Sequence, residues 1–527
     1  MGKPEIITSR EAAALLADGA VVGSCGFLMH GAAEEIWMAI EQRYLEEQKP
    51  RDLTLMWASG IGDGKMRGLN HLCHEGLIAK TIGGHYGLIK KMHPLINENK
   101  IAAYNYPQGV LSQMFRDMAA KKPAMVTKIG LGTFVDPEFG GGCVNAAAKE
   151  PITRRIEIDG EDYLMYTCQK LDYAILRGTE ADENGNISFR KEALSWESLS
   201  VAMAARNNGG KIIVQVEKIV KNGAIDPKDV KIPGIMVDYI VITQDMDNHW
   251  QTMGTKFNEE FISRRTRFEA AVTPVPAVEN FTIRDIIGRR GALAVRKSDY
   301  ILNYGIGMPE SVASVLDYEN VTSHFMATVE PGVIGGVAQG GGDFGSAIGA
   351  EAIIDEPYQF DFYDGGGLDL TFLGMAECDA TGSINVSRFG PDCPGCGGFI
   401  DISQSAKMVV FCGSFTAKGL KVKVEDKKLI IVNEGTTKKF INKLEQITFN
   451  GVYEAFKGKT VLYITERAVF QLKEEGLTLI EIAPGVDMEK DILAQMEFAP
   501  VISTELKLMD ERIFSSDSLG LSELFAD

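Results

Sequence analysis

An internal repeat of domain size restricts the folds that this chain can adopt. The segment from Asp172 to Ile187 recurs between Asp369 and Ile384. Both copies contain an aspartate, an apolar run and then Glu, Asp and Gly in the same order, at a constant offset of 197 residues. Each copy is followed by a lysine that opens an apolar run, Lys211 in the first and Lys407 in the second. Matches in a fixed order indicate duplicated domains, and the long period excludes a solenoid of short repeats.

The two halves also begin alike, with apolar and glycine-rich stretches at residues 19–27 and 300–309. A chain of 527 residues is too long for one ordinary hydrophobic core. Residues Thr273–Ala277 contain two prolines, which cannot continue a helix and favour an extended connector. We therefore expect two similar domains, residues 1–275 and residues 276–527.

Short apolar runs alternate with helical patterns in both halves. Residues Ser9–Ala17 predict an N-capped amphipathic helix. Four apolar runs predict buried strands: Ile212–Val216, Tyr239–Thr243, Met408–Cys412 and Thr460–Ile464. Residues 413–432 have a two-residue period that favours an antiparallel hairpin. The alternation indicates an α/β fold with mainly parallel sheets flanked by helices, in which ligands bind where the strands end.

Charge and composition exclude several classes of partner. The net charge of −18 argues against a nucleic-acid surface and against binding to anionic membranes. No apolar run approaches the length of a membrane span, and the N-terminal residues lack the layout of a secretory signal. The eight cysteines are scattered, as is typical of reduced thiols. We therefore expect a cytoplasmic protein with neither nucleic-acid nor membrane partners.

Glu330 is the first candidate for a reactive residue. It ends the apolar run of residues 326–329 and is followed by Pro331 and Gly332. This places a carboxylate at the end of a strand with little side-chain bulk nearby. A nucleophilic glutamate needs such a position, because a second molecule must approach it closely. The simpler alternative is a structural polar residue before a Pro-Gly turn.

Other motifs are less specific. The glycine-rich stretches at residues 140–142, 340–345 and 365–367 do not form a Walker P-loop, and they favour loops that a backbone or ligand approaches closely. Cys393 and Cys396 form a CxxC pair, which raises zinc or redox chemistry. The pair lies in a glycine loop, and His71–His74 could supply further ligands only through long-range folding. We therefore expect no metal, and the lack of a Gly-x-Ser-x-Gly elbow disfavours a serine hydrolase.

Four segments in combination resemble the family I coenzyme A transferases, over essentially the whole chain. Residues 328–336 resemble the Glu-x-Gly-x-x-Gly segment of the family, and residues 106–111 its Pro-Gln-Gly-x-Leu segment. Residues 395–401 resemble its Gly-x-Gly-Gly-x-x-Asp loop, and residues 303–309 its Gly-Ile-Gly turn. Pro331 directly follows the glutamate, as in the acetate/propionate type, in which both halves are fused into one chain.

The resemblance assigns roles to particular residues. It implies that Glu330 is the nucleophile and that Gln108 meets the carboxyl group of the acid substrate. The N–H groups of Gly397 and Gly398 would face the reacting carbonyl, and Cys396 fills the variable position of their loop. The resemblance also implies that Gly305, Ile306 and Gly307 lie near the thioester of coenzyme A. Lys418, with Lys421 and Lys423, is a candidate partner of the coenzyme A phosphates, and a solvated charged strand face is the equal alternative.

The activity implied by the resemblance is transfer of coenzyme A between short-chain carboxylic acids, in class EC 2.8.3. Glu330 would form a mixed anhydride and then a glutamyl-CoA thioester, which predicts ping-pong kinetics. Coenzyme A is then a substrate and no cofactor is permanently bound. The partners are acyl-CoA and short-chain carboxylates, and the resemblance implies a homo-oligomer, a dimer or a tetramer. Because the nucleophile must be ionised, we expect a site that does not raise its pKa.

Several alternatives stay open at this point. The acid pair could be drawn from acetate, propionate, lactate, butyrate and acrylate. A phosphosugar isomerase or deaminase would use the related fold, which does not by itself determine function. An acyl-CoA-binding protein would use the same segments without catalysis, and a hydrolase or a lyase subunit is disfavoured because the halves are fused.

Overall fold

The computed structural model describes residues 3–263 and 278–526. The chain divides into two compact units that are interleaved along the sequence. Unit 1 consists of Met1–Phe268, Val329–Phe362 and Ser387–Asp401, and unit 2 consists of Glu269–Thr328, Tyr363–Val386 and Ile402–Asp527. The predicted boundary between residues 275 and 276 lies outside the described residues and stays a prediction. Glu330, which that boundary assigns to the C-terminal domain, lies in a segment of unit 1.

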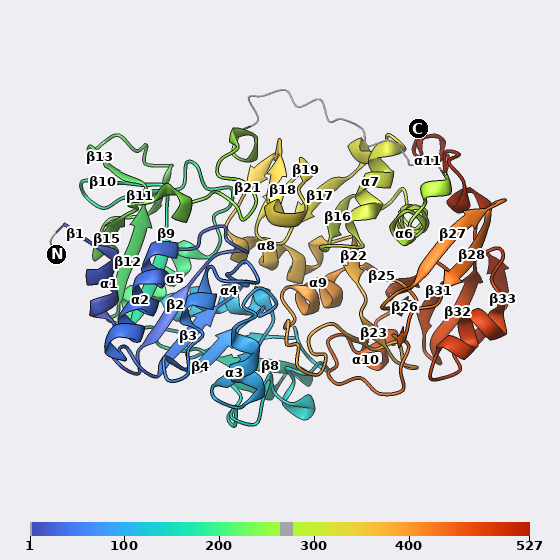
Figure 1. Cartoon of the computed structure of the whole chain (residues 1–527), viewed down its shortest axis with the longest axis horizontal. Helices are drawn as coiled ribbons and strands as arrows, with labels where there is room; N and C mark the ends of the chain where they lie inside the picture. The colour runs from blue at the N-terminus through green and yellow to red at the C-terminus, as the bar shows by residue number, and fades with distance from the viewer. Residues whose placement is uncertain (1–2, 264–277, 527) are drawn as a thin grey trace. The chain divides into compact units, whose positions relative to one another are not determined.

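The main sheet of unit 1 has the strand order β1-β15-β12-β9-β2-β3-β4-β5, and every neighbouring pair is parallel. The strands are β1 (Glu5–Ile7), β2 (Val21–Ser24), β3 (Leu53–Trp57), β4 (Ile78–Gly83), β5 (Ala102–Asn105), β9 (Tyr173–Arg177), β12 (Lys211–Val216) and β15 (Tyr239–Ile242). The unit also contains α1 (Ser9–Leu15), α2 (Glu34–Glu47), α3 (Met92–Asn97), α4 (Gln108–Ala119) and α5 (Ser198–Asn207). Helix α1 packs on α2 and α4 packs on α5 (Figure 1), which leaves the strands almost wholly buried, as parallel sheets require.

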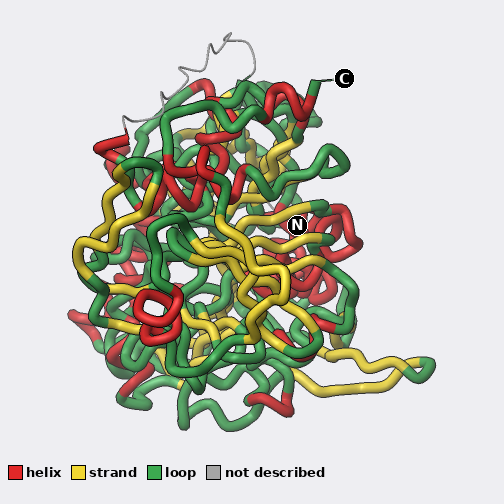
Figure 2. The backbone as a smooth tube through the Cα atoms, turned by 90° about the vertical axis from the view of Figure 1, so that its right-hand side faces the viewer, coloured by secondary structure: helices red, strands yellow, loops and turns green. Residues whose placement is uncertain are grey.

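Smaller elements of unit 1 surround this sheet. One sheet has the order β6 (Ala124–Thr127), β8 (Glu161–Thr167), β7 (Thr153–Ile158), and another has β13 (Lys218–Val220), β10 (Glu180–Asp182), β11 (Ile187–Ser188), β14 (Val230–Ile232). The segment Val329–Phe362 adds β18 (Val333–Ile334), β19 (Val337–Ala338), β20 (Ala347–Ile348), β21 (Ala352–Ile353) and α8 (Glu356–Phe362). Long loops and turns, green in Figure 2, link the elements of the chain.

Unit 2 contains strands in the order β17-β16-β22-β25-β30-β31-β32-β33. Their bounds are β16 (Ile301–Tyr304), β17 (Met326–Val329), β22 (Leu370–Gly374), β25 (Met408–Cys412), β30 (Thr460–Ile464), β31 (Ala468–Lys473), β32 (Gly476–Ile482) and β33 (Val501–Leu508). The remaining short strands are β23 (Glu377–Cys378), β24 (Ile384–Asn385), β26 (Thr416–Ala417), β27 (Lys421–Glu425), β28 (Lys428–Asn433) and β29 (Thr437–Lys438). The helices α6 (Ile283–Ala292) and α7 (Glu310–Tyr318) lie side by side (Figure 1), and α9 (Phe399–Ser405), α10 (Gly451–Ala455) and α11 (Leu521–Phe525) follow along the chain.

The strand orders confirm two similar α/β domains with mainly parallel sheets. The order β15-β12-β9-β2-β3 in unit 1 has its counterpart in β30-β25-β22-β16-β17 in unit 2. The repeated aspartate has the same task in each unit. Asp172 Oδ2 accepts a hydrogen bond from the Val21 N–H at 2.8 Å, and Asp369 Oδ2 accepts one from the Ile301 N–H at 2.9 Å. Each aspartate thereby fixes the start of the neighbouring strand.

Most of the individual elements agree with the sequence. The four predicted strands are β12, β15, β25 and β30, and the predicted hairpin is the antiparallel pair of β27 and β28. The first helix begins at the predicted Ser9 but ends at Leu15, two residues early. Its cap is Thr8, whose Oγ1 accepts from the Glu11 N–H at 3.2 Å while Glu11 Oε2 accepts from the Thr8 N–H at 2.8 Å. This reciprocal capping box defines the helix start.

The turn after Glu330 depends on Gly332. The Gly332 N–H donates to the Val329 carbonyl at 3.0 Å, and the Gly332 carbonyl accepts from the Ile354 N–H at 2.9 Å. Gly332 has a φ of +113°, and a Cβ atom there would lie 2.0 Å from the Ile354 carbonyl oxygen. Only glycine therefore allows the chain to turn between β17 and β18 while it packs against Ile354.

We expect Gly332→Ala to lower the free energy of unfolding by about 3 kcal/mol or more, because it adds a backbone clash to an unfavourable φ. Gly349→Ala is the matched control, since Gly349 has a φ of +70° in the same segment but open space around it. It should cost only about 1 kcal/mol. Urea unfolding measures both values, and equal losses would show that the approach of Ile354 does not constrain the turn.

Candidate active site

Glu330 lies one residue after β17, in the Val329–Phe362 segment of unit 1. Its side chain is partly buried. Desolvation raises the pKa of its carboxyl group from 4.5 to about 7. This corrects the expectation that the site leaves the pKa unchanged. The carboxylate is still about half ionised at neutral pH, and a more basic nucleophile attacks more readily once ionised.

An aromatic pair braces the turn that follows Glu330. The rings of Phe27 and Phe344 have centroids 5.7 Å apart. Between them and the turn lies Gly345, where a Cβ atom would be 2.7 Å from Phe27 Cδ1 and 3.4 Å from Pro331 Cγ. Gly345 therefore lies between the Phe27 ring and Pro331, where a larger residue would not fit without a shift.

Gln108 begins helix α4 and is buried. Its backbone N–H donates to the Gly397 carbonyl at 2.9 Å. Its side-chain Nε2 donates to Glu356 Oε1 at 3.0 Å. The structure thus brings together two segments that the sequence singled out, Gln108 and the Gly397 loop, and adds Glu356, which it did not.

Glu356 is a fully buried carboxyl group at the first position of α8. It also accepts a hydrogen bond from Ser59 Oγ at 3.2 Å. Burial raises the pKa of Glu356 well above its usual value, and the charges of Glu197 and Glu330 add to the rise. Burial likewise raises the pKa of Glu197 to about 8. Glu197 and Glu356 therefore titrate as a coupled pair, and Glu330 lies close enough for its charge to act on Glu356.

The glycine loop before α9 is anchored to the elements around Gln108. The Cys396 N–H donates to Asn105 Oδ1 at 2.9 Å. Asp401 accepts from the N–H groups of Gly109 at 3.3 Å and Val110 at 3.2 Å. These N–H groups belong to the first turn of α4, which lacks partners within the helix. Asp401 therefore ties the end of the loop to the helix that positions Gln108.

One of the two predicted oxyanion donors, the Gly397 N–H, already forms a hydrogen bond within the protein. The Gly397 N–H donates to the Gly84 carbonyl at 2.8 Å, so that it is already paired. Gly398 follows it and is buried at the start of α9. A Cβ atom on Gly397 would lie 3.8 Å from His85 Cδ2, which places the imidazole beside the loop. Burial lowers the pKa of His85 to about 4, so that the ring is neutral at physiological pH.

The residues predicted to contact coenzyme A lie in unit 2. Gly305 follows β16 and donates its N–H to the Phe372 carbonyl at 2.8 Å, and Gly307 donates its N–H to Glu310 Oε1 at 2.9 Å. The N–H groups of this turn are thus engaged, while the Ile306 side chain is 56% exposed. Lys418 is exposed between β26 and β27, and Lys423 is paired with Glu425 at 2.9 Å.

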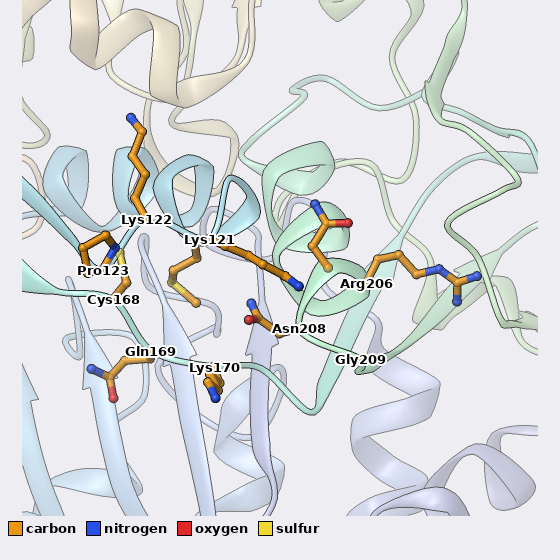
Figure 3. A pocket seen from close by; sticks show the side chains of 11 residues that line it. Lys121, Lys122, Pro123, Cys168, Gln169, Lys170, Arg206, Asn208 and Gly209 are labelled. Carbon is orange, nitrogen blue, oxygen red and sulfur yellow. The ribbon is translucent and has the colours of Figure 1, made fainter.

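A separate pocket of about 680 Å³ lies in unit 1 beyond the C-terminal ends of α4 and α5. Its lining includes Lys121, Lys122, Lys170 and Arg206, and none of the predicted site residues. In Figure 3 the Lys122 and Arg206 side chains point in different directions. Lys122 is paired with Asp117 at 2.7 Å and Arg206 with Asp238 at 3.1 Å. The four cations therefore do not converge on a single anion.

The CxxC pair consists of two buried thiols, Cys393 and Cys396, which are not joined in a disulfide bond. Across residues 3–263 and 278–526, no group of three or more His, Cys, Asp or Glu side chains is arranged to hold a metal ion. None of the helices in these same ranges has the length and apolar character needed to cross a bilayer.

Sequence reasoning missed Ser59, Glu197, Glu356 and His85. Two of them carry a signal that is visible in retrospect. Glu356 directly precedes a proline, as Glu330 does, and Ser59 lies shortly after the buried strand β3. Neither pattern distinguishes a site residue from an ordinary polar residue at the end of a strand. Their proximity to Gln108 becomes evident only in the folded unit.

Comparison with known proteins agrees with this geometry. Residues 6–243 match the coenzyme A transferase family. The chain is 44% identical to caffeate CoA-transferase of Acetobacterium woodii over 525 residues, which cover 99% of each protein. It is 41% identical to acetate CoA-transferase YdiF of Escherichia coli O157:H7 over 522 residues, 98% of this chain and 97% of that protein.

A solved structure extends the likeness to three dimensions. The acyl-CoA transferase YdiF from E. coli O157:H7, crystallised as a thioester complex with CoA, matches with a TM-score of 0.90 and 40% identity. The match covers 98% of this chain and 97% of that one. Neither an isomerase nor a non-catalytic acyl-CoA-binding protein fits relatives of this kind over the full chain. The chain belongs to the coenzyme A transferase family and is a CoA-transferase.

Proposed function

We propose that this CoA-transferase moves coenzyme A between short-chain carboxylic acids through a glutamyl-CoA thioester on Glu330. The observation that carries the proposal is the Glu330 carboxylate, partly buried after β17 and with a pKa of about 7. It shares unit 1 with Gln108 and Glu356, and the charge of Glu330 acts on Glu356. The relative crystallised as a thioester complex with CoA supports a covalent route.

The proposed reaction needs no co-reactant. A Glu330 carboxylate oxygen attacks the thioester carbon and the C–S bond breaks. The CoA thiolate departs, and a mixed anhydride forms between Glu330 and the acyl group. The thiolate then attacks the glutamyl carbonyl, the anhydride C–O bond breaks and the donor acid departs as its carboxylate. An incoming carboxylate reverses these two steps and leaves as the new acyl-CoA. Each exchange of one nucleophile for another conserves charge, and covalent catalysis divides a difficult transfer into easier steps.

The surrounding residues have separate tasks in this proposal. The Gln108 amide, held by Glu356 at 3.0 Å, would donate to the carboxylate of the acid. Gly398 is the proposed oxyanion donor, because the N–H of Gly397 is paired with Gly84. A donor of this kind contributes about 2.7–4 kcal/mol in other acyl-transfer enzymes. In unit 2, the exposed Ile306 and Lys418 remain the proposed contacts for coenzyme A.

The acid class follows from the resemblance to the acetate/propionate type and from a relative named for acetate. The relative named for caffeate supplies a second candidate, an aryl-acrylic acid. The aromatic pair of Phe27 and Phe344 beside the Glu330 turn would restrict the space for a large acyl group. A homo-oligomeric state and a cytoplasmic location stay predictions.

Incubation with acetyl-CoA alone should convert Glu330 to a thioester, because the first half-reaction needs no acceptor acid. Borohydride or hydroxylamine treatment followed by peptide mass mapping locates the adduct. Glu330→Gln should form no adduct and lose transfer activity by about a thousandfold or more. Glu351→Gln, which removes an exposed carboxylate from the same segment, is the control and should retain both. An adduct on another residue would defeat the proposal.

The rate of adduct formation should depend on pH with a midpoint near 7. Only the ionised carboxylate attacks, and burial raises the pKa of Glu330 to about 7. The single-turnover rate should therefore fall about tenfold for each pH unit below the midpoint and level off above it. A rate that stays constant from about pH 5.5 to pH 8 would show that a carboxylate of ordinary pKa near 4.3 is the nucleophile.

Small acceptor acids should react with the thioester enzyme faster than large ones. With the thioester form of the enzyme isolated, acetate and propionate should discharge it at least about tenfold faster than caffeate, if the resemblance to the acetate/propionate type extends to the acyl site and the site is too small for an aryl group. The measurement is the second-order rate of acyl-CoA formation for each acid. The opposite ranking would assign the enzyme to aryl-acrylic acids while leaving the Glu330 mechanism intact.

A further inference from the structure

Glu356 is a buried acid that forms and breaks no bond in the proposed reaction. It lies at the first position of α8, in the same Val329–Phe362 segment as Glu330, and its side chain is inaccessible to water. An ionised carboxyl group in such a place is costly unless it is hydrogen-bonded or shares a proton with a neighbour. The contacts of Glu356 therefore show which interactions stabilise its buried carboxyl group.

Two buried donors converge on the Glu356 carboxyl group. Ser59 Oγ donates to Oε1 at 3.2 Å, and Gln108 Nε2 donates to the same oxygen at 3.0 Å. All three side chains are at most 2% exposed. Water therefore does not compete for these hydrogen bonds, and the orientation of the Gln108 amide is determined by Glu356.

The contact leaves one donor of Gln108 uncommitted to Glu356. A primary amide carries two N–H donors, and Glu356 Oε1 takes one of them. The backbone of Gln108 is fixed separately, because its N–H donates to the Gly397 carbonyl at 2.9 Å. One hydrogen bond thus restrains the side-chain amide and another fixes the backbone, which limits the directions open to the second N–H.

Glu197 is a second buried carboxyl group, and its charge acts on Glu356. It is 1% exposed and directly precedes α5. The pKa of each of these two glutamates is raised, first by burial, and the charge of Glu197 adds to the rise at Glu356. The charge of Glu197 therefore disfavours ionisation of Glu356.

We propose that Glu356 is a positioning residue of the transferase, which orients the Gln108 amide toward the carboxylate of the acid substrate. This inference rests on the proposed function and extends it to the half-reaction with the acid. Glu356 acts through Gln108 and forms no bond to the substrate. Its removal should therefore impair the acid step more than the acyl-CoA step.

The test separates the two half-reactions in four variants: Glu356→Ala, Glu356→Gln, Gln108→Ala and the Gln108→Ala/Glu356→Ala double variant. Acetyl-CoA alone loads Glu330, and acetate then discharges the isolated thioester. Glu356→Ala should raise the acetate concentration at half-maximal rate about tenfold, the effect of losing one oriented hydrogen bond to a charged group. The loading rate should change less than about threefold. Glu356→Gln keeps an acceptor oxygen and should restore most of the loss.

The double variant decides whether Glu356 works through Gln108. If it does, the double variant is no worse than Gln108→Ala, because the orienting residue has nothing left to orient. Gln113→Ala is the matched control, since Gln113 Nε2 donates to Asp361 Oδ1 at 3.1 Å and links the same two helices. It should lower the melting temperature without changing the dependence on acetate.

Each outcome bears on a distinct claim. Multiplicative losses in the double variant, or equal losses in both half-reactions, would overturn the positioning role. If Glu356→Ala does not fold, a Glu356→Gln protein as impaired toward acetate as Gln108→Ala would overturn it as well. Failure of the wild-type enzyme to load Glu330 would instead refute the proposed function, and the two failures are therefore distinguishable.

Discussion

A carboxylate that leaves water loses hydration energy, and at Glu330 this loss raises the pKa from 4.5 to about 7. The structure around it makes such a position possible. The Gly332 turn allows the chain to leave β17 sharply, with a φ that a side chain would not tolerate. The Phe27 and Phe344 rings pack on one another near Gly345, which lies beside Pro331. The carboxylate is thereby held away from bulk water and yet remains about half ionised at neutral pH, when an acyl-CoA can be attacked.

The duplicated fold explains how distant segments meet. The two halves share the order of five strands, yet the second half contributes Val329–Phe362 and Ser387–Asp401 to the compact unit built on the first. Within that unit, Glu356 and the Gly397 loop approach Gln108 at the start of α4. The repeat alone would suggest two independent sites. The interleaved segments instead place the polar residues of both halves around one helix start.

Much of this arrangement could be predicted from the sequence. The repeated Asp172 and Asp369 reflect a local rule, since each fixes the start of a neighbouring strand. Glu330 and Gln108 could be singled out because their segments resemble those of a known family. Glu356, Ser59 and Glu197 could not, because their importance comes from burial and mutual proximity, which no local pattern encodes. The raised pKa of Glu330 was missed for the same reason. The pairing of the Gly397 N–H with Gly84 likewise depends on how a loop is anchored.

The ionisation of Glu330 can be measured directly. Infrared difference spectra between the wild-type enzyme and Glu330→Gln, recorded from about pH 5 to pH 9, isolate the carboxyl bands of this residue. The account predicts that its protonated C=O band loses half its intensity near pH 7, with a smaller response from the coupled Glu356. A Glu330 band that is already absent at about pH 5.5 would mean an ordinary solvated carboxylate, and would contradict the central role of desolvation at this site.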